Sequence, residues 1–185
     1  QAHFDHTADL ALIKEQTDAR LFATQADKSF LEDGGLSDPL IGGFESFRPV
    51  TVDGVITDGD VITLGDIRLS VLEHPGHTEG SASYAMTITE SGHSYDVLVV
   101  NMAYINEGVN VTIKPTYHGI SADFEGTFES QRGLSPDIWV SSHKSAYEFH
   151  KKHEPGQAYD PRAFYDPVGY IEAVQIGRAS CRERV

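Results

Sequence analysis

The apolar residues in the first third of the chain follow helical spacing in short stretches. The segment from Asp5 to Thr17 carries an apolar stripe of this kind, and Thr7 stands where it can cap the helix. The stripe consists of Leu10, Leu12 and Ile13. We also expect a short strand over residues 20–24 and a short helix over residues 27–31, followed by a glycine-bracketed loop around Asp38-Pro39.

From Val50 onward the apolar residues alternate with a period of two, which favours strands. Strands are expected over residues 50–56, 61–64, 67–74, 81–89, 95–101 and 137–142, with turns at Asp58-Gly59, Gly65-Asp66 and residues 91–94. Helices are expected over residues 121–132 and 145–153, and a last one opens at Asp166-Pro167. Strands mixed with helices throughout predict a layered α/β domain.

Composition limits the classes of protein that the pattern can describe. The 185 residues suit a single domain, and 39% hydrophobic with 23% charged residues is typical of a globular chain. No apolar run approaches the ~20 residues that a membrane helix needs, so we expect no membrane insertion. The net charge of -14 would repel a phosphate backbone, which argues against a nucleic-acid partner.

Both ends of the sequence bear on the domain assignment. The chain opens on Gln1 instead of Met, so we expect that an N-terminal part with the first strands is absent and that any signal peptide lies outside this sequence. Residues 176–185 read like the translation of a common sequencing adapter. We therefore assign the domain to residues 1–175 and expect 176–185 to be a non-native tail. Because Cys181 lies in that tail, the domain itself has no thiol or disulfide chemistry.

Three separate places along the chain offer metal ligands. The first is the segment from Gln1 to His6, the second is the loop from His74 to Gly80, and the third is His143 at the end of a predicted strand. Zinc binds imidazole and carboxylate groups, and active sites gather in loops at strand ends. A single histidine is more often packed or solvated than a ligand, but the joint pattern favours a metal site.

The three segments together resemble the metallo-β-lactamase superfamily, whose motif is HxHxDH followed by a loop histidine and a terminal histidine. The resemblance covers nearly all of residues 1–175 and includes HPGHTEGS and the strand-end SSH. It implies an α/β fold, the four-layer αβ/βα sandwich, here expected without its first strands. A glutamine in the first motif position, with QAHFDHT, LEDGG and HPGHTEGS, is similar to the GOB-like branch of subclass B3.

The resemblance also implies the ligands of one or two zinc ions. The first ion would be held by Gln1, His3 and His77, and the second by Asp5, His6 and His143. Asp5 would in addition orient the nucleophile, a metal-bound hydroxide that attacks the β-lactam carbonyl. An amide oxygen is a weaker zinc ligand than imidazole, so we expect Gln1 to weaken the first site.

The resemblance further implies a monomer that acts on a small β-lactam such as a carbapenem, works in the periplasm or is secreted, and confers antibiotic resistance. Glyoxalase-II-like thioesterases and lactonases are the alternative, and they add a bridging aspartate at the end of a middle strand. Here that strand ends in Asn101-Met102, and Asp96 comes too early, which favours a β-lactamase. Gln1 also leaves open a degenerate metal-binding protein without turnover.

The remaining candidates receive lesser roles. We expect His74 and Thr78 to support the metal ligands from outside, and Gly76 and Gly80 to permit a close loop geometry. Pocket contacts are expected from Tyr104, Asn106, Asn110 and His118. Trp139 and Phe149 are expected to pack in the core, and the side chains of His93, His150 and His153 to be solvated.

Overall fold

The computed structural model describes residues 1–44, 46–160 and 162–183. A five-stranded sheet forms its centre, with the strand order β3-β4-β5-β6-β7, and β1 and β2 form a separate two-stranded parallel sheet. The strands are β1 (Phe22–Thr24), β2 (Gly54–Ile56), β3 (Val61–Leu64), β4 (Ile67–Glu73), β5 (Ala82–Glu90), β6 (His93–Val100) and β7 (Ile138–Ser141). The helices are α1 (Phe4–Thr7), α2 (Leu10–Thr17), α3 (Gln25–Asp33), α4 (Ile120–Arg132), α5 (Phe149–Lys152) and α6 (Pro167–Glu183).

The central sheet is an antiparallel meander from β3 to β6, to which β7 adds in parallel. The parallel register pairs Leu98 with Trp139 and Val100 with Ser141. This pairing requires a crossover, which α4 supplies between β6 and β7. As a result, the chain after β7 begins at the same sheet end at which β6 finishes, and His143 lies there.

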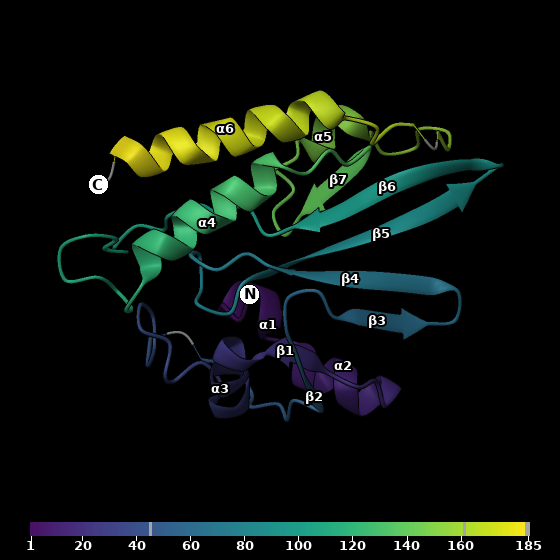
Figure 1. The fold of residues 1–185 in the computed structure, drawn as a ribbon. Coiled ribbons are helices and arrows are strands. Elements are labelled where there is room, and N and C mark those ends of the chain that lie inside the picture. The colour runs from purple at the N-terminus through teal and green to yellow at the C-terminus, as the bar shows by residue number, and fades with distance from the viewer. Residues whose placement is uncertain (45, 161, 184–185) are drawn as a thin grey trace.

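One face of the sheet packs against α4 and α6, and the other faces the N-terminal part of the chain (Figure 1). The first core contains Leu98, Val100, Met102, Ala103, Val111, Ile120, Phe124, Phe128, Trp139, Tyr170 and Val174. Phe124 and Phe128, at i and i+4 on α4, both belong to this core. Trp139 is 2% exposed, which confirms its core assignment.

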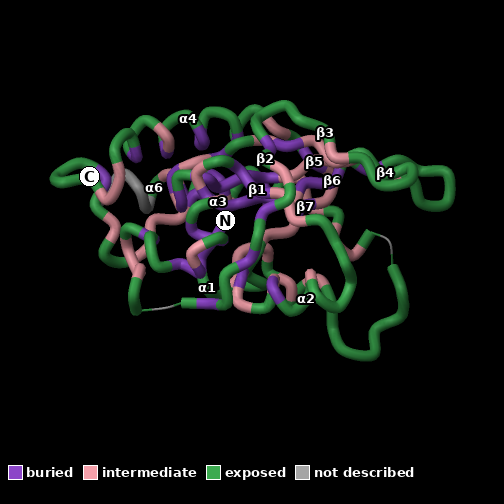
Figure 2. Tube along the Cα trace, turned by 90° about the horizontal axis from the view of Figure 1, so that it is seen from below, coloured by how far each residue is buried: buried purple, intermediate pink, exposed green. Residues whose placement is uncertain are grey.

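The opposite face carries the small sheet and the first three helices. Ile56, Val71 and Ala82 pack together between the two sheets, and Ala11, Phe30 and Leu31 join β1 to the helices outside it. The order of layers is therefore helices, sheet, sheet, helices, the αβ/βα sandwich that the resemblance implied. Buried residues gather where these layers meet, while the outward segments are exposed (Figure 2).

The single helix expected from Asp5 to Thr17 is wrong in detail, because α1 and α2 are separate helices. Thr7 does not cap the second one: its hydroxyl donates to the His3 carbonyl oxygen at 2.9 Å within α1. The expected apolar stripe is also misplaced. Leu12 and Ile13 are about half exposed, whereas Ala11 is buried.

Other boundaries shift for local reasons. The helix expected over residues 145–153 shortens to α5, because Glu148 adopts a positive φ of 54° that no α-helix contains. Only the last three residues of the stretch 50–56 form a strand, and the turn after β5 is confined to Ser91-Gly92, so His93 already belongs to β6. Helix α6 continues through residues 176–183, part of the segment that resembles an adapter translation.

Among the described residues, no helix combines the length and the apolar character needed to cross a bilayer.

Candidate metal centre

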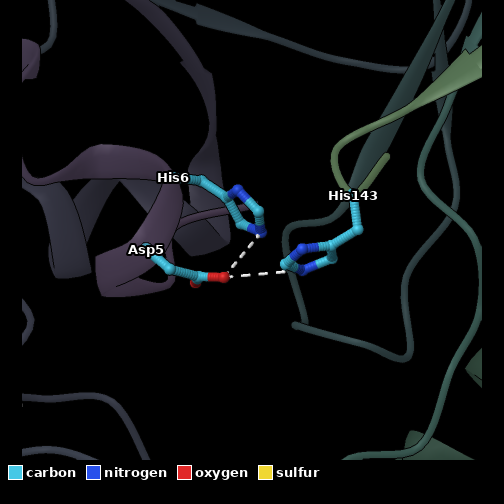
Figure 3. A group of neighbouring side chains, drawn as sticks. All are labelled: Asp5, His6 and His143. Carbon is cyan, nitrogen blue, oxygen red and sulfur yellow. Dashed lines mark ion pairs between the residues drawn. The ribbon is translucent and has the colours of Figure 1, made fainter. Parts of the chain in front are cut away.

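Asp5, His6 and His143 form one cluster, although His143 is far from the other two in the sequence (Figure 3). Each offers one ligand atom, and these atoms all lie within 4.8 Å of one another. The Asp5 Oδ2 atom is 3.2 Å from His6 Nε2 and 3.5 Å from His143 Nε2. Helix α1 presents the first two side chains and the end of β7 presents the third. We call these three residues the Asp5 cluster.

His6 shows most directly that the Asp5 cluster suits a metal ion. Its Nε2 atom is buried and makes no hydrogen bond to the described residues. Burial lowers the pKa of His6, and the neighbouring His143 lowers it further, while Asp5 acts in the opposite direction. The imidazole is therefore neutral near pH 7 and keeps a lone pair, which metal binding requires.

His3 and His77 form a second pair beside the Asp5 cluster. Their ring centroids are 4.9 Å apart at an interplanar angle of 73°. The Nδ1 atom of His77 donates to the Tyr104 carbonyl oxygen at 2.7 Å, so Nε2 carries the lone pair. Burial lowers the pKa of His77 to about 4, against the opposing effect of the Tyr104 hydrogen bond. His77 is thus a neutral imidazole held in one tautomer.

The amide oxygen of Gln1 is held by the backbone and is not a free ligand atom in this arrangement. Its side chain is buried, and its Oε1 atom accepts a hydrogen bond from the His3 backbone N–H at 2.9 Å. The amide oxygen is therefore already engaged with the chain that carries His3. In this arrangement Gln1 supports the backbone of the metal motif.

The loop that carries His77 is fixed by contacts that leave no room for extra atoms. Gly76 has a φ of 130°, and a Cβ there would lie 2.8 Å from the Phe124 ring. A Cβ on Gly80 would lie 2.4 Å from the Thr24 Oγ1 atom. Both positions confirm the predicted need for glycine.

A buried carboxylate on α3 holds the same loop from the other side. Asp27 Oδ1 accepts from the Gly80 N–H at 3.1 Å, and Oδ2 accepts from the Thr78 hydroxyl at 3.2 Å. Thr78 thus supports His77 through the loop backbone, in line with its predicted outer role. Sequence reasoning did not identify Asp27, because a lone aspartate in a helix is usually solvated.

His74 serves the packing beneath the site and makes no contact to the Asp5 cluster. It is fully buried, with Nδ1 2.6 Å from Ser83 Oγ and Nε2 3.0 Å from Ser130 Oγ. Burial lowers the pKa of His74 to about 4. Its two serine partners link β5 to α4, so this histidine joins the sheet to the helix.

The other residues that we predicted to line the pocket differ in whether they contact the candidate metal site. Tyr104 contributes its backbone carbonyl to His77, and its ring packs against the first core. His118 is exposed, and a narrow cavity beside His3 and His77 is lined instead by its neighbours Thr116 and Tyr117. Asn110 interacts within its own loop, where its N–H donates to Thr116 Oγ1.

Asp38 is a second carboxylate that sequence reasoning did not identify. Its Oδ2 atom lies 3.6 Å from His3 Nε2, and both side chains are buried. Its sequence context, Asp-Pro between two glycine pairs, predicts a loop and gives no hint of the contact with His3.

The donor set fits zinc, because the Asp5 cluster supplies two imidazoles and one carboxylate, and the His3–His77 pair supplies two more imidazoles beside it. Asp96 does not add a bridging carboxylate: it is exposed, and its Oδ1 atom accepts from the Thr87 hydroxyl in the β5–β6 hairpin. The arrangement therefore offers open coordination positions near an exposed carboxylate.

Comparison with known proteins agrees with this geometry. The metallo-beta-lactamase superfamily pattern matches residues 2–89. Among solved structures, a beta-lactamase from Chitinophaga pinensis is 35% identical with a TM-score of 0.95. The match covers 100% of this chain and 70% of that chain. The class B3 di-zinc metallo-beta-lactamase LRA-12 from an Alaskan soil metagenome is 39% identical with a TM-score of 0.93. The match covers 100% of this chain and 70% of that chain.

The metallo-beta-lactamase GOB-18 from Elizabethkingia meningoseptica is 36% identical with a TM-score of 0.93, and the match covers 100% of this chain and 68% of that one. Curated relatives match over shorter segments. A hydroxyacylglutathione hydrolase from Mesorhizobium japonicum is 28% identical over 52% of this chain and 31% of its own length. The curated relatives are thus matched over a third to a half of their length.

Proposed function

The chain belongs to the metallo-β-lactamase superfamily, and from this membership we propose that the protein hydrolyses the amide bond of β-lactam antibiotics in a zinc-dependent reaction. The observation that carries the proposal is the Asp5 cluster, which the fold assembles from helix α1 and the end of β7. The three solved structures compared above are named as β-lactamases, which supports this substrate class over others.

The chain contributes imidazole ligands and an exposed carboxylate. His6 and His143 supply nitrogen lone pairs, while Asp5 supplies one oxygen between them. The Asp5 side chain is 53% exposed, so its carboxylate can also accept a hydrogen bond from a water molecule that approaches the substrate carbonyl. Zinc, when bound, supplies Lewis acidity and lowers the pKa of a coordinated water.

Substrate positioning follows from the depth of the two histidine groups. His3 is buried and His77 is partly buried, whereas His143 is 56% exposed, so the centre opens to solvent on the side of His143. A β-lactam carbonyl would approach from that side, next to Asp5. We further propose that Gln1 marks a GOB-like enzyme with a weaker first zinc site, because its amide oxygen is engaged by the His3 N–H.

The test is hydrolysis of a carbapenem by the purified protein and its variants. Asp5→Asn and His143→Ala should each lower kcat/KM by at least about 100-fold, since the first replaces a carboxylate with a weaker amide ligand and the second removes an imidazole. His93→Ala, an exposed histidine in the β5–β6 hairpin, is the matched control and should retain full activity. Equal activity of all four proteins would refute the assignment.

A second candidate, hydrolysis of a glutathione thioester, is supported by the similarity to a hydroxyacylglutathione hydrolase. Thioesterases of this kind use a bridging carboxylate, and Asp96 is turned toward Thr87 instead. The β-lactam assay should therefore be run beside a thioester assay with the same variants. Thioester turnover that depends on Asp5, without β-lactam turnover, would transfer the assignment to this class.

Action in the periplasm or outside the cell is part of the β-lactamase proposal.

A further inference from the structure

Asp38 lies in the long loop after α3, and the loop backbone fixes the direction of its carboxylate. The Oδ1 atom accepts two hydrogen bonds, from the Leu40 N–H at 2.8 Å and the Ile41 N–H at 3.0 Å. The side chain is only 4% exposed. A carboxylate held by two N–H groups on one oxygen presents its other oxygen in a defined direction.

That other oxygen faces His3. Asp38 Oδ2 is 3.6 Å from His3 Nε2, slightly beyond hydrogen-bond length, and the His3 side chain is 8% exposed. In a buried environment a carboxylate is strongly stabilised by a facing donor. A carboxylate in this position therefore favours the proton on Nε2, the imidazole nitrogen that faces it.

Resting on the proposed zinc chemistry, we propose that Asp38 is a positioning residue that keeps the His3 proton on Nε2 and leaves the Nδ1 lone pair for the metal. His77 is held in the complementary way, because its Nδ1 proton is donated to the Tyr104 carbonyl oxygen. Two adjacent imidazoles thus have their tautomers fixed by separate acceptors, one a side chain and one a backbone group.

The substitution Asp38→Asn separates this role from a loop role. An asparagine can still accept from the Leu40 and Ile41 N–H groups through Oδ1, so the loop remains capped. The group facing His3 becomes an NH2, which only donates. His3 must then accept at Nε2 and move its proton to Nδ1, the wrong nitrogen for the metal.

The first readout is the position of the proton in the metal-free 185-residue chain, by long-range ¹H–¹⁵N correlation of labelled histidines at pH 8. His3→Gln identifies the His3 signals by their loss. We expect the proton on Nε2 in the unmodified chain and on Nδ1 in Asp38→Asn. An Nδ1 proton in the unmodified chain would overturn the proposal by itself, even if the variant fails to fold.

The second readout is zinc affinity, by titration against a competing chelator. Asp38→Asn should weaken one site by about 10–100-fold and leave the site of the Asp5 cluster unchanged. Asp33→Asn is the matched control, because the Asp33 oxygens accept from the Leu36 and Ser37 N–H groups in the same loop. Identical zinc affinities in Asp38→Asn and the unmodified chain would overturn the proposal. A titration in which neither protein binds a second zinc ion would overturn it as well.

Neither readout uses a β-lactam. A chain with the expected tautomer and zinc affinities but without β-lactam turnover would refute the proposed substrate and retain the role of Asp38. Conversely, β-lactam turnover together with an unchanged His3 tautomer in Asp38→Asn would support the proposed substrate and refute the role of Asp38.

Discussion

The backbone at Gly80 leaves no space for a side chain. A Cβ would lie 2.4 Å from Thr24 Oγ1 and 2.5 Å from the Asp27 backbone nitrogen. Gly80→Ala should therefore destabilise the chain by about 1–3 kcal/mol, the cost of overpacking a close contact. Urea unfolding of the metal-free chain measures this loss.

Gly126, in the middle of α4, is the matched control for that substitution. Nothing lies within 4 Å of a Cβ built there, so Gly126→Ala should stabilise the chain by about 0.5–1 kcal/mol through helix propensity. A Gly80→Ala chain as stable as Gly126→Ala would contradict the described loop geometry.

His74 makes the folded state sensitive to acid. Burial lowers its pKa to about 4 in the folded state from 6.5 in the unfolded chain. The unfolded chain therefore binds more protons between pH 6.5 and pH 4, and the free energy of unfolding falls as the pH drops through this window. One such group contributes at most about 1.4 kcal/mol per pH unit.

The pH dependence is measured by urea unfolding of the metal-free chain between pH 4 and pH 8. His74→Gln should reduce the slope below pH 6.5, where His77 still contributes because its pKa is also lowered to about 4. His93→Gln, which alters an exposed histidine, should leave the slope unchanged. An undiminished slope in His74→Gln would show that His74 is not the neutral buried group described.

At the residue scale, the sequence identifies the histidines better than their partners. Asp5, His6 and His143 stand in recognisable motifs, and the fold brings them together. The contacts made by Asp27 and Asp38 depend on loops from distant parts of the chain, and an isolated aspartate carries no signal of burial. The engagement of the Gln1 oxygen by the His3 N–H likewise depends on backbone dihedrals that residue type does not fix.

Helices α4 and α6 meet through a buried tyrosine. The Tyr170 hydroxyl donates to the Gln131 carbonyl oxygen at 2.8 Å, and the side chain is fully buried. Tyr170→Phe keeps the ring packing but loses this hydrogen bond, so we expect a destabilisation of about 1 kcal/mol in urea unfolding.

Tyr165→Phe is the control for the α4–α6 contact, because that tyrosine is 48% exposed. It should leave the free energy of unfolding within about 0.5 kcal/mol of the unmodified chain. Equal effects of the two substitutions would contradict a buried hydrogen bond between the helices.

At the element scale, the strands and the longer helices were predicted more accurately than the short helices. The strands over 67–74, 81–89 and 95–101 and the helix over 121–132 recur with shifts of one or two residues. The short helices α1, α2 and α5 differ from expectation because tertiary contacts and single residues such as Glu148 decide a few turns. The β-branched stretch 50–56 pairs only where β1 is available.

At the scale of the whole molecule, the candidate metal centre draws its residues from both halves of the sandwich. Helix α1 and the loop of Asp38 lie in the N-terminal part, whereas the His77 loop and His143 follow strands of the central sheet (Figure 1). The order of elements was sufficient to expect a layered α/β domain, and the family resemblance implied the four-layer sandwich. The distances between ligands depend on how the layers pack, and no single segment determines that packing.

Ring opening of a carbapenem, followed by absorbance before and after removal of zinc, is the first test of zinc-dependent β-lactam hydrolysis. We expect turnover that a chelator abolishes, that added zinc restores, and that Asp5→Asn lowers by at least about 100-fold. Turnover that persists without zinc, or a zinc-loaded protein that opens no β-lactam ring, would refute zinc-dependent β-lactam hydrolysis.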